Sequence, residues 1–332
     1  MPPVLASVWR GGVCEGRIRG HVAVATAAGE LIGSAGDAYA MTTLRSCVKP
    51  LQALPYVRLA ADALGVTEAE VAIACASHQG EDDHLATVRG LLAKAGLDES
   101  ALGCGPQLPY NEAAARRLLA SGGTPQPIHN NCSGKHAAML ATCVVMGWPL
   151  DGYKDSTHPG QVAVTKALED ALGMSLADGP QGIDGCGLTT YGTPLAAIAR
   201  GFAAASADRA FQRCQDAMGA HPRLIAGTQK FDTALLAEAG EHVTAKIGGA
   251  AVWAAVVRPG VAGIAIKLEA GAAEAMPVAA IAVLQHLGVL ERDLPDSLRG
   301  FATLPLHNWS GTEVGEIRPE PEALRSIAQI PR

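Results

Sequence analysis

The stretch that sets the fold class is AAVWAAVVRPGVAGIAIKL, residues 250–268. It contains two runs rich in Ala, Val and Ile, Ala250–Val257 and Val261–Leu268, on either side of Arg258, Pro259 and Gly260. Such residues favour strands, and a Pro-Gly pair between two runs of this kind favours a turn. The stretch therefore predicts an antiparallel hairpin.

The first forty residues contain three more strand-like runs. Ala6–Trp9, His21–Ala25 and Glu30–Gly33 are short and largely apolar, and they indicate a second antiparallel meander. Because the segment between the two sets of strands has helical patterns, we expect an α+β fold with the terminal strands in one sheet. No repeat or linker interrupts the chain. We expect a single domain over residues 1–332 with a central helical region.

Helical patterns fill the middle of the chain. Apolar residues at helical spacing predict a helix over Ser46–Gly65, in which Pro55 kinks or splits the helix. The apolar run Val71–Ala76 is predicted as a strand or a buried turn. An acidic helix start at Glu81 is predicted to continue to about Gly96, because acidic residues stabilise a helix N-terminus.

Two loops rich in turn-forming residues interrupt these helices. The first covers Ser121–Cys132 and the second Gly182–Gly187, and each contains one cysteine. Long loops inside a compact domain are often functional. A buried helix over Lys135–Met146 is predicted after the first loop, and a helix that begins at Pro194 and runs to Ala205 after the second.

The composition excludes several classes of protein. Of 332 residues, 48% are hydrophobic and 17% are charged, and the net charge is −6 with no block of Lys and Arg. Nucleic-acid binders carry a basic footprint, so DNA and RNA are not expected partners. The opening MPPVLASVWRGG has no leader pattern, and no run approaches the roughly 18 apolar residues of a membrane span. We expect a soluble, cytoplasmic protein that does not bind membranes.

The eight cysteines contain no C-x-x-C pair. In a reduced cytosolic chain, most cysteines are small core residues. That prediction applies to five of them: Cys14, Cys75, Cys104, Cys143 and Cys214. The other three lie in motifs rich in polar residues.

Ser46 and Lys49 form an S-x-x-K pattern at the start of the first predicted helix. A spacing of three residues places the hydroxyl and the amine on one helix face. A lysine whose pKa is lowered can take the proton of a serine and make it a nucleophile. The alternative is a serine that caps the helix and a lysine that is solvated.

Three further clusters combine polar side chains with glycine. Ser77 and His78 follow an apolar run, and they either face a cleft or cap the next helix. The segment His129–His136 reads HNNCSGKH, which is denser in hydrogen-bonding groups than capping requires. In Asp184–Gly187, DGCG, the glycines permit backbone approach to a ligand, or they only form a tight turn.

In their order along the chain, these motifs resemble the rhizobial-type, thermolabile L-asparaginase family. The matching segments are RSCVKP at 45–50, ASH at 76–78, NCSGKH at 131–136, DGCG at 184–187, HP at 221–222 and IKL at 266–268. The resemblance extends from about Ala6 to Gly271. It implies hydrolysis of L-asparagine to L-aspartate and ammonia. It also implies a fold like that of serine β-lactamases, penicillin-binding proteins and glutaminases, with helices packed on a sheet, and a homodimer.

The resemblance also assigns roles to residues. Ser46 resembles the nucleophile and Lys49 its base, and Ser77 resembles a second serine that is paired with Lys267. Cys132, Lys135 and Cys186 resemble a site for one zinc ion per subunit that is not directly catalytic. Four residues resemble substrate-binding positions: Arg45, His129, His136 and Asp184. Arg223 and Ala251 depart from the family pattern, which has acidic residues there.

Two other functions remain open at this point. An S-x-x-K pattern also occurs in penicillin-binding and β-lactamase-type acylases, although the chain has no S-D-N or K-T-G triplet. A non-catalytic protein that binds a metal or a small molecule is the third interpretation. The joint presence of Ser46, Lys49, Ser77 and Lys267 favours the amidohydrolase, in which a serine is acylated and water then releases aspartate.

Overall fold

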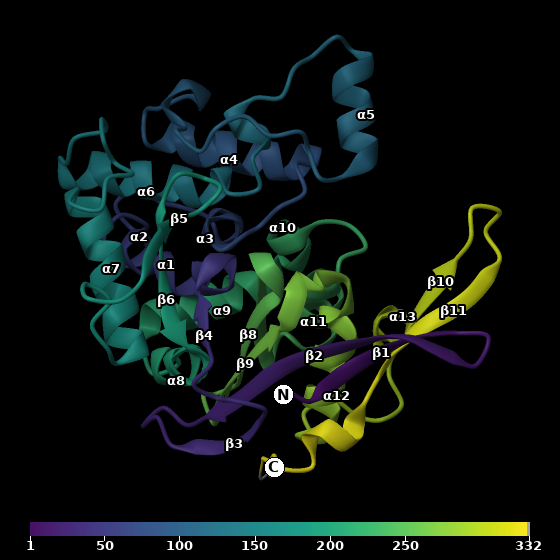
Figure 1. Ribbon diagram of the computed structural model, residues 1–332. Helices are drawn as coiled ribbons and strands as arrows, with labels where there is room; N and C mark the ends of the chain where they lie inside the picture. Colours follow the sequence, from purple (N-terminus) through teal and green to yellow (C-terminus); the bar gives the residue numbers. More distant parts are fainter. Residues whose placement is uncertain (331–332) are drawn as a thin grey trace. The chain divides into compact units, whose positions relative to one another are not determined.

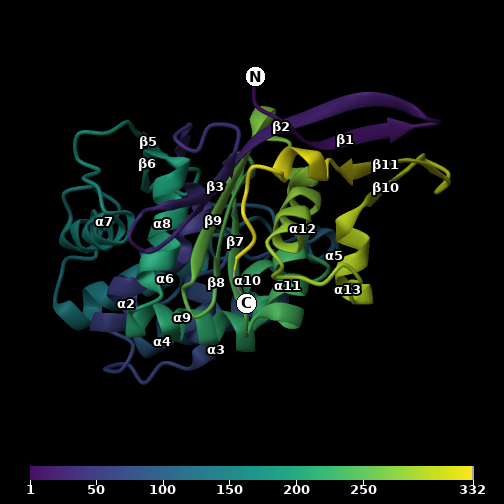
Figure 2. The ribbon, with the colours of Figure 1, turned by 90° about the horizontal axis from the view of Figure 1, so that it is seen from below.

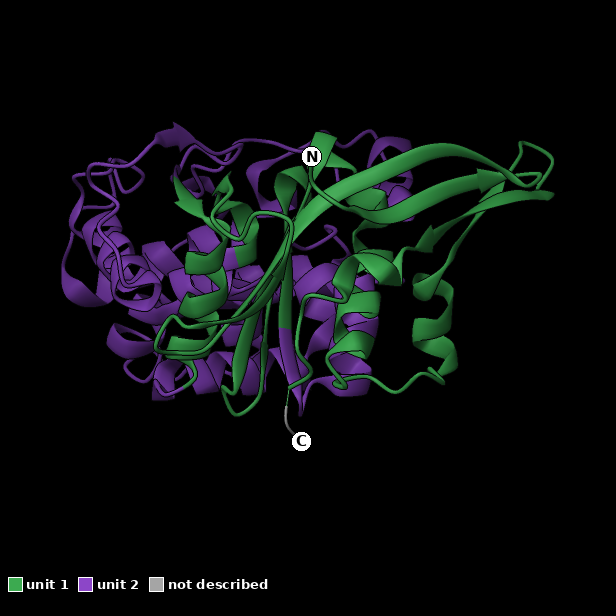
Figure 3. Ribbon diagram, turned by 60° about the horizontal axis from the view of Figure 1, so that its bottom comes forward, with its two compact units in different colours: residues 1–47, 192–206, 245–332 green, residues 48–191, 207–244 purple. Residues whose placement is uncertain are grey.

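The computed structural model describes residues 1–330, and it has the α+β composition that the sequence predicts. The chain forms two compact units (Figure 3). Unit 1 contains Met1–Cys47, Gly192–Ser206 and Ala245–Arg332, and unit 2 contains Val48–Tyr191 and Ala207–Thr244. Each unit is therefore built from segments that are far apart in the sequence.

Unit 1 is built on a sheet whose strands come from both the N-terminal and the C-terminal parts of the chain. The strand order is β10-β11-β1-β2-β9-β8-β7, and β3 pairs with β2. Figure 1 shows the N-terminal β2, in purple, beside the much later β9, in green. The strands are β1 (Val4–Arg10), β2 (Val13–Ala25), β3 (Leu31–Ala35), β7 (Val243–Gly248), β8 (Val252–Val257), β9 (Ala262–Leu268), β10 (Leu304–His307) and β11 (Glu313–Pro319). A short strand, β4 (Met41–Thr43), pairs with the end of β6 (Thr189–Pro194).

The predicted hairpin of residues 250–268 is confirmed. β8 and β9 pair antiparallel, with Val252 opposite Lys267 and Val257 opposite Ala262. β9 also pairs with β2, where His21 lies opposite Lys267. Both strands are buried almost throughout, which explains their continuous apolar sequence.

Helices cover both faces of the strands of unit 1. Figure 2 shows α8 (Leu195–Ala205) and α12 (Met276–His286) on opposite sides of β8 and β9. A Cβ at Gly263 of β9 would lie 1.8 Å from the main-chain oxygen of Ala199 in α8. Only glycine permits this close approach of helix to strand. The remaining helical elements are α13 (Asp296–Ala302) and the 3₁₀ turns η4 (Gly249–Ala251), η5 (Glu269–Gly271), η6 (Ala273–Ala275) and η7 (Pro321–Leu324).

Unit 2 is mainly helical and is organised around α6 (Ser133–Met146). Residues 133–143 of α6 are all buried, and the helix packs against α2, α3, α4 and α7. The other elements are η1 (Arg45–Val48, shared with unit 1), α1 (Lys49–Gln52), α2 (Leu54–Leu59), α3 (Glu68–Ala74), α4 (Asp82–Lys94), η2 (Glu99–Ala101), α5 (Glu112–Ala120), η3 (Pro127–His129), α7 (Pro159–Leu172), β5 (Gln181–Ile183), α9 (Arg209–Ala220), α10 (Pro222–Ala226) and α11 (Phe231–Ala239).

A second glycine fixes the start of α6. A Cβ at Gly134 would lie 2.2 Å from the main-chain oxygen of Ile73 in α3. The N-terminal turn of α6, which carries Lys135, therefore lies directly against α3. This contact places two of the polar motifs of the sequence side by side.

Two predicted elements are wrong in detail. Val71–Ala76 is not a strand, because Glu68–Ala74 forms α3 and all of Val71–Ala74 is buried, and only Cys75 in the run lies in a turn. A fully buried helix has no polar face, so its sequence resembles a buried strand. The predicted helix over Ser46–Gly65 is divided into η1, α1 and α2, and the last of these ends at Leu59.

No disulfide links the eight cysteines in the structure. Cys75, Cys104, Cys143 and Cys214 are buried, as predicted. Cys14 is not a core residue, because it lies half-buried on the outer part of β2. Within residues 1–330, no helix is long and apolar enough to cross a bilayer.

Candidate active site

Five of the predicted site residues lie together in unit 2: Lys49, Ser77, Cys132, Lys135 and Cys186. We call them the Lys49–Ser77 group. The amine of Lys49, at the first position of α1, is fully buried. It donates hydrogen bonds to the main-chain oxygens of Ala76 and, at 3.3 Å, Asn131, and it lies 3.0 Å from the hydroxyl of Ser77. Lys49 thus joins the loop after α3 to the loop before α6.

Burial lowers the pKa of Lys49, because the charged amine loses its hydration. The nearby thiolate of Cys132 opposes this shift, whereas the positive charge of Lys135 adds to it. A lysine whose pKa is lowered gives up its proton more readily, as a general base must.

The loop that carries Ser77 is held by the main chain on both sides. The amide of Ser77 donates to Ile225 of α10 at 2.9 Å, and the amide of His78 donates to Asn131 at 3.2 Å. Of the two interpretations of this loop, capping of α4 by Ser77 or His78 is wrong. The N-cap of α4 is Glu81, whose amide donates to Nδ1 of His84.

The two cysteines form a hydrogen-bonded pair beside Lys135. Cys132 precedes α6, Cys186 lies in the glycine-rich turn, and both are buried. Nζ of Lys135 lies 3.4 Å from Sγ of Cys186. The hydrogen bond from the Cys186 thiol holds the pKa of Cys132 well below its usual value, and Lys49 and Lys135 add to this effect. The same bond and burial raise the pKa of Cys186.

Lys135 is held in its charged form by its neighbours. Burial alone would lower its pKa, but the negative charge on the Cys132–Cys186 pair and the carboxylate of Asp184 outweigh that effect and raise it. Once their protons are released, Cys132, Cys186 and Lys135 could serve as donors to a metal ion. Two thiolates and one amine are chemically suited to zinc, so the residues present fit such an ion.

The remaining predicted residues of unit 2 have specific partners. Asp184 begins a tight turn, in which its carboxylate accepts from the amide of Gly185 at 2.9 Å. His129 ends η3, and its Nδ1 accepts from the amide of Gln126 at 2.9 Å. His136 is fully buried in α6, and its Nδ1 lies 2.7 Å from the hydroxyl of Tyr153. Nε2 of His136 has no hydrogen-bond partner in the described part of the chain.

Two residues that position this group were missed in the sequence. The side chain of Asn130 accepts from the amide of Cys132 at 2.9 Å and donates to Cys104 and Gly105. The hydroxyl of Tyr153 accepts from the amide of Gly103 at 2.7 Å while it contacts His136. The density of polar residues in 129–136 was a signal for Asn130. Nothing in its local sequence distinguished Tyr153.

The other predicted site residues, Arg45, Ser46 and Lys267, belong to unit 1, where Arg45 and Lys267 contact the turn Gly248–Ala251. We call Arg45, Ser46 and Lys267 the Ser46–Lys267 group. A Cβ at Gly249 would lie 2.6 Å from the guanidinium of Arg45, so this side chain crosses the turn closely. Nζ of Lys267 donates to the main-chain oxygens of Ala250 at 2.5 Å and Leu268 at 2.8 Å. The side chains of Arg45 and Lys267 therefore both contact this turn.

Backbone strain is concentrated at this turn. Arg45, Ala250 and Ala251 have positive φ values of 47°, 55° and 53°. Residues with a Cβ rarely adopt this conformation, which costs about 1–3 kcal/mol each, and such strain often occurs at functional sites. Burial lowers the pKa of Lys267, which Glu269 partly opposes.

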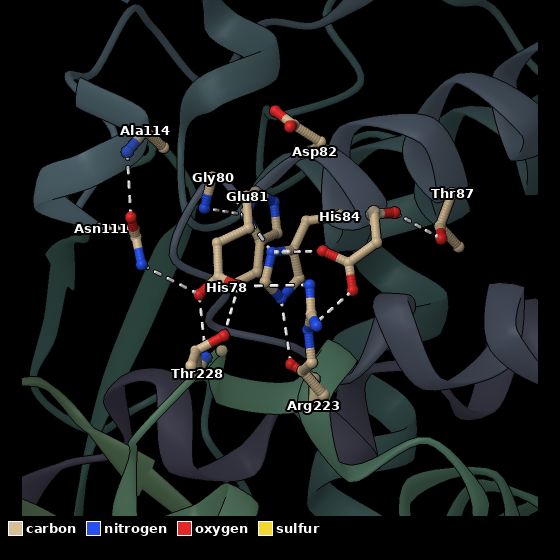
Figure 4. Close-up of polar contacts among 12 residues, drawn as sticks. His78, Gly80, Glu81, Asp82, His84, Thr87, Asn111, Ala114, Arg223 and Thr228 are labelled. Atoms are coloured by element: carbon tan, nitrogen blue, oxygen red, sulfur yellow. Dashed lines mark hydrogen bonds and ion pairs between the residues drawn. The ribbon is translucent and has the colours of Figure 1, made fainter. Parts of the chain in front are cut away.

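A third polar cluster lies at the start of α4, and the negative charge of its carboxylates is balanced by an arginine of the same chain. Ligand atoms of Glu81, Asp83 and His84 lie within 4.8 Å of one another. Figure 4 shows the guanidinium of Arg223 beside them, with Nε 3.0 Å from Asp83 and Nη2 3.5 Å from Glu81. Arg223, which departs from the family pattern, therefore supplies a positive charge to this cluster.

Comparison with known proteins identifies the family. No curated protein sequence matches the chain. The crystal structure of Mglu in its native form is similar at 16% identity and a TM-score of 0.44, over 93% of this chain and 74% of that chain. The model of the family described as L-asparaginase II matches residues 6–319, which is nearly the whole chain. The chain therefore belongs to the L-asparaginase II family, the enzymes that hydrolyse L-asparagine.

Proposed function

We propose that this L-asparaginase works by acyl transfer to a serine that a buried lysine activates. The amide carbonyl of L-asparagine is attacked, ammonia leaves, and water then releases L-aspartate from the acylated serine. The observation that carries the proposal is the environment of Lys49, a buried amine whose pKa burial lowers.

The hydrogen bonds of Lys49 suggest which group exchanges a proton with it. A neutral lysine has two N–H groups and one lone pair. The main-chain oxygens of Ala76 and Asn131 can only accept, so they take the two N–H groups. The lone pair then remains for the hydroxyl of Ser77, 3.0 Å away. This arrangement supports a Ser77–Lys49 proton exchange, in addition to the Ser77–Lys267 pairing that the family resemblance implies.

In the proposed reaction, Ser46 is the nucleophile and Lys49, three residues later, is the base that receives its proton through the hydroxyl of Ser77. The proton passes through Ser77 to the departing nitrogen, and Lys267 supports Ser77 electrostatically. Water then attacks the ester, its proton returns to Ser46 by the same route, and L-aspartate is released. Arg45, His129, His136 and Asp184 are proposed to bind the charged ends of the substrate.

We further propose that Cys132, Lys135 and Cys186 hold one zinc ion. Zinc in such a site would supply a fixed positive charge that orients the α-amino and α-carboxylate groups of the substrate. The lowered pKa of the Cys132 thiol supports this assignment, because zinc binds cysteine as the thiolate. The serines and Lys49 carry out the proton transfers.

The finer fold and assembly assignments are also proposals. We propose a fold like that of serine β-lactamases and penicillin-binding proteins, supported by the presence of a mainly helical unit and a unit built on an antiparallel sheet. We propose a homodimer, as the family resemblance implies, and a cytoplasmic location. Sedimentation at several concentrations tests the dimer, and a persistent monomer would contradict it.

The decisive experiment measures ammonia release from L-asparagine and L-glutamine, with zinc content determined on the same sample. Ser46→Ala should abolish turnover and leave the unfolding temperature unchanged. Ser310→Ala, in the exposed β10–β11 turn, is the matched control and should retain full activity. Near-normal turnover by Ser46→Ala would rule out Ser46 as the nucleophile. Hydrolysis of a chromogenic cephalosporin would instead favour a β-lactamase-type acylase.

A further inference from the structure

His78, next to Ser77 in the chain, has a hydrogen bond on each ring nitrogen although its side chain is fully buried. The amide of Gly80 donates to Nδ1 at 3.1 Å, as Figure 4 shows, and Nε2 lies 2.8 Å from the hydroxyl of Ser133. A main-chain N–H can only donate, so Nδ1 carries no proton. The proton is therefore on Nε2, which donates to Ser133.

Ser133 lies at the opposite end of this bond and is the first residue of α6, directly after Cys132. Its hydroxyl is buried, and its amide donates to Asn130 at 2.8 Å. The amide of His78 also donates to Asn131 at 3.2 Å. The segments 76–80 and 130–133 are thus joined by a side-chain bond and a main-chain bond.

Lys49 spans the same two segments. Its acceptors are the main-chain oxygens of Ala76, in the first segment, and Asn131, in the second. The distance between Lys49 and Ser77 therefore depends on how the two segments lie against each other. A displacement of about 1 Å in such a geometry can cost roughly a hundredfold in rate.

A second histidine holds the ring of His78 in place. The rings of His78 and His84 are stacked, with centroids 5.1 Å apart and planes inclined by 16°. Nδ1 of His84 accepts from the amide of Glu81, so its Nε2 donates to the main-chain oxygen of Arg223 at 3.0 Å (Figure 4). Glu81 in turn accepts from the amide of Thr228 at 2.8 Å. Neither imidazole can rotate without breaking its hydrogen bonds.

We infer that His78 is a positioning residue for the reaction: its bond to Ser133 holds Ser77 within hydrogen-bonding distance of Lys49. The inference rests on the proposed roles of Lys49 and Ser77, and it adds His78 and Ser133 to them. Burial holds the pKa of His78 well below its usual value, which preserves the single neutral tautomer that the bond needs.

The test is a double-mutant cycle on kcat and KM for L-asparagine. His78→Leu and Ser133→Ala should each lower kcat by about ten- to a hundredfold, with KM changed less than about threefold. The double variant should be no slower than the slower single variant, because both remove one bond. His78→Gln, whose amide can donate in place of Nε2, should recover at least part of the loss.

The matched control is His158→Gln, a buried histidine at the start of α7 whose Nε2 bonds to the main-chain oxygen of Pro149. It should lower the unfolding temperature while kcat per folded molecule stays unchanged. If His78→Leu fails to fold, Ser133→Ala and His78→Gln still complete the test. The inference would be overturned if the fold-loss of kcat in the double variant equalled the product of the losses in the two single variants. Normal kcat in Ser133→Ala would also overturn it.

The proposed function is tested separately in the same assay by Ser77→Ala and Lys49→Met. If these two variants retain full activity, the proposed function fails. If they lose activity while the His78 and Ser133 variants do not, only the positioning role fails.

Discussion

The two lysines that are proposed to take part in the reaction differ in their surroundings although they make similar main-chain contacts. Each donates to two main-chain oxygens, Lys49 in the Lys49–Ser77 group of unit 2 and Lys267 in the Ser46–Lys267 group of unit 1. Lys49 is fully buried beside a hydroxyl and a thiolate, whereas Lys267 is partly exposed on a strand near Glu269. Loss of hydration, rather than hydrogen bonding, therefore distinguishes Lys49, the candidate base, from Lys267, the supporting charge.

The largest expected effect tests the different roles proposed for Lys49 and Lys267. Lys49→Met should lower kcat by about a thousandfold, within the range for loss of a general base. Lys49→Arg should be as inactive, because arginine stays protonated in proteins. Lys267→Arg should keep measurable activity, since it preserves the positive charge. Lys166→Met, on the exposed face of α7, is the control. Equal activity in Lys49→Arg and the native enzyme would exclude Lys49 as the base.

A second prediction concerns the metal. Chelation should raise KM for L-asparagine by about tenfold while kcat changes little, because the proposed ion orients substrate and takes no proton. Cys132→Ser and Cys186→Ser should reproduce this effect and lower the zinc content. Cys214→Ser, which changes a buried cysteine in α9, should keep its zinc. Zinc retained in both site variants would place the ion elsewhere.

The third prediction compares the close contacts of the two units. Gly134→Ala and Gly263→Ala each place a Cβ against a main-chain oxygen, at 2.2 Å and 1.8 Å. Each should cost about 1–3 kcal/mol of unfolding free energy, as overpacking does. Gly134→Ala should also reduce activity per folded molecule, because it displaces the start of α6. Gly300→Ala, which meets no atom within 4 Å, should not destabilise the protein in urea titrations.

The smallest effect is the pH dependence that the two stacked histidines give to unit 2. Burial lowers the pKa of His78 and His84 in the folded protein below 6.5, the ordinary pKa of histidine. When the pH falls below 6.5, the unfolded chain therefore binds more protons at these two residues than the folded chain does. The stability that these two histidines contribute is therefore fully present above pH 6.5, and it is lost as the pH falls below that value. His84→Gln should show a shallower decline in denaturation midpoint between pH 7 and pH 5. An identical slope would assign the acid sensitivity to other groups.

The sequence predicted local features well. The hairpin at 250–268 and the helix after the first loop depend on neighbouring residues, and both are present. Val71–Ala76 was misread because a fully buried run has no helical periodicity. The contact between Lys49 and Ser77 was not predicted, because tertiary packing alone brings these residues together across 28 positions. Tyr153 was missed for the same reason.

The three segments that meet at Lys49 have a consequence for folding. Its acceptors lie 27 and 82 positions away in the chain, so the amine is surrounded only after two long loops have closed. Contacts of such sequence separation form slowly, because the entropy of loop closure precedes the gain from the contact. During refolding, helical signal should therefore return before amidase activity, and newly made chains should pass through a helical but inactive state.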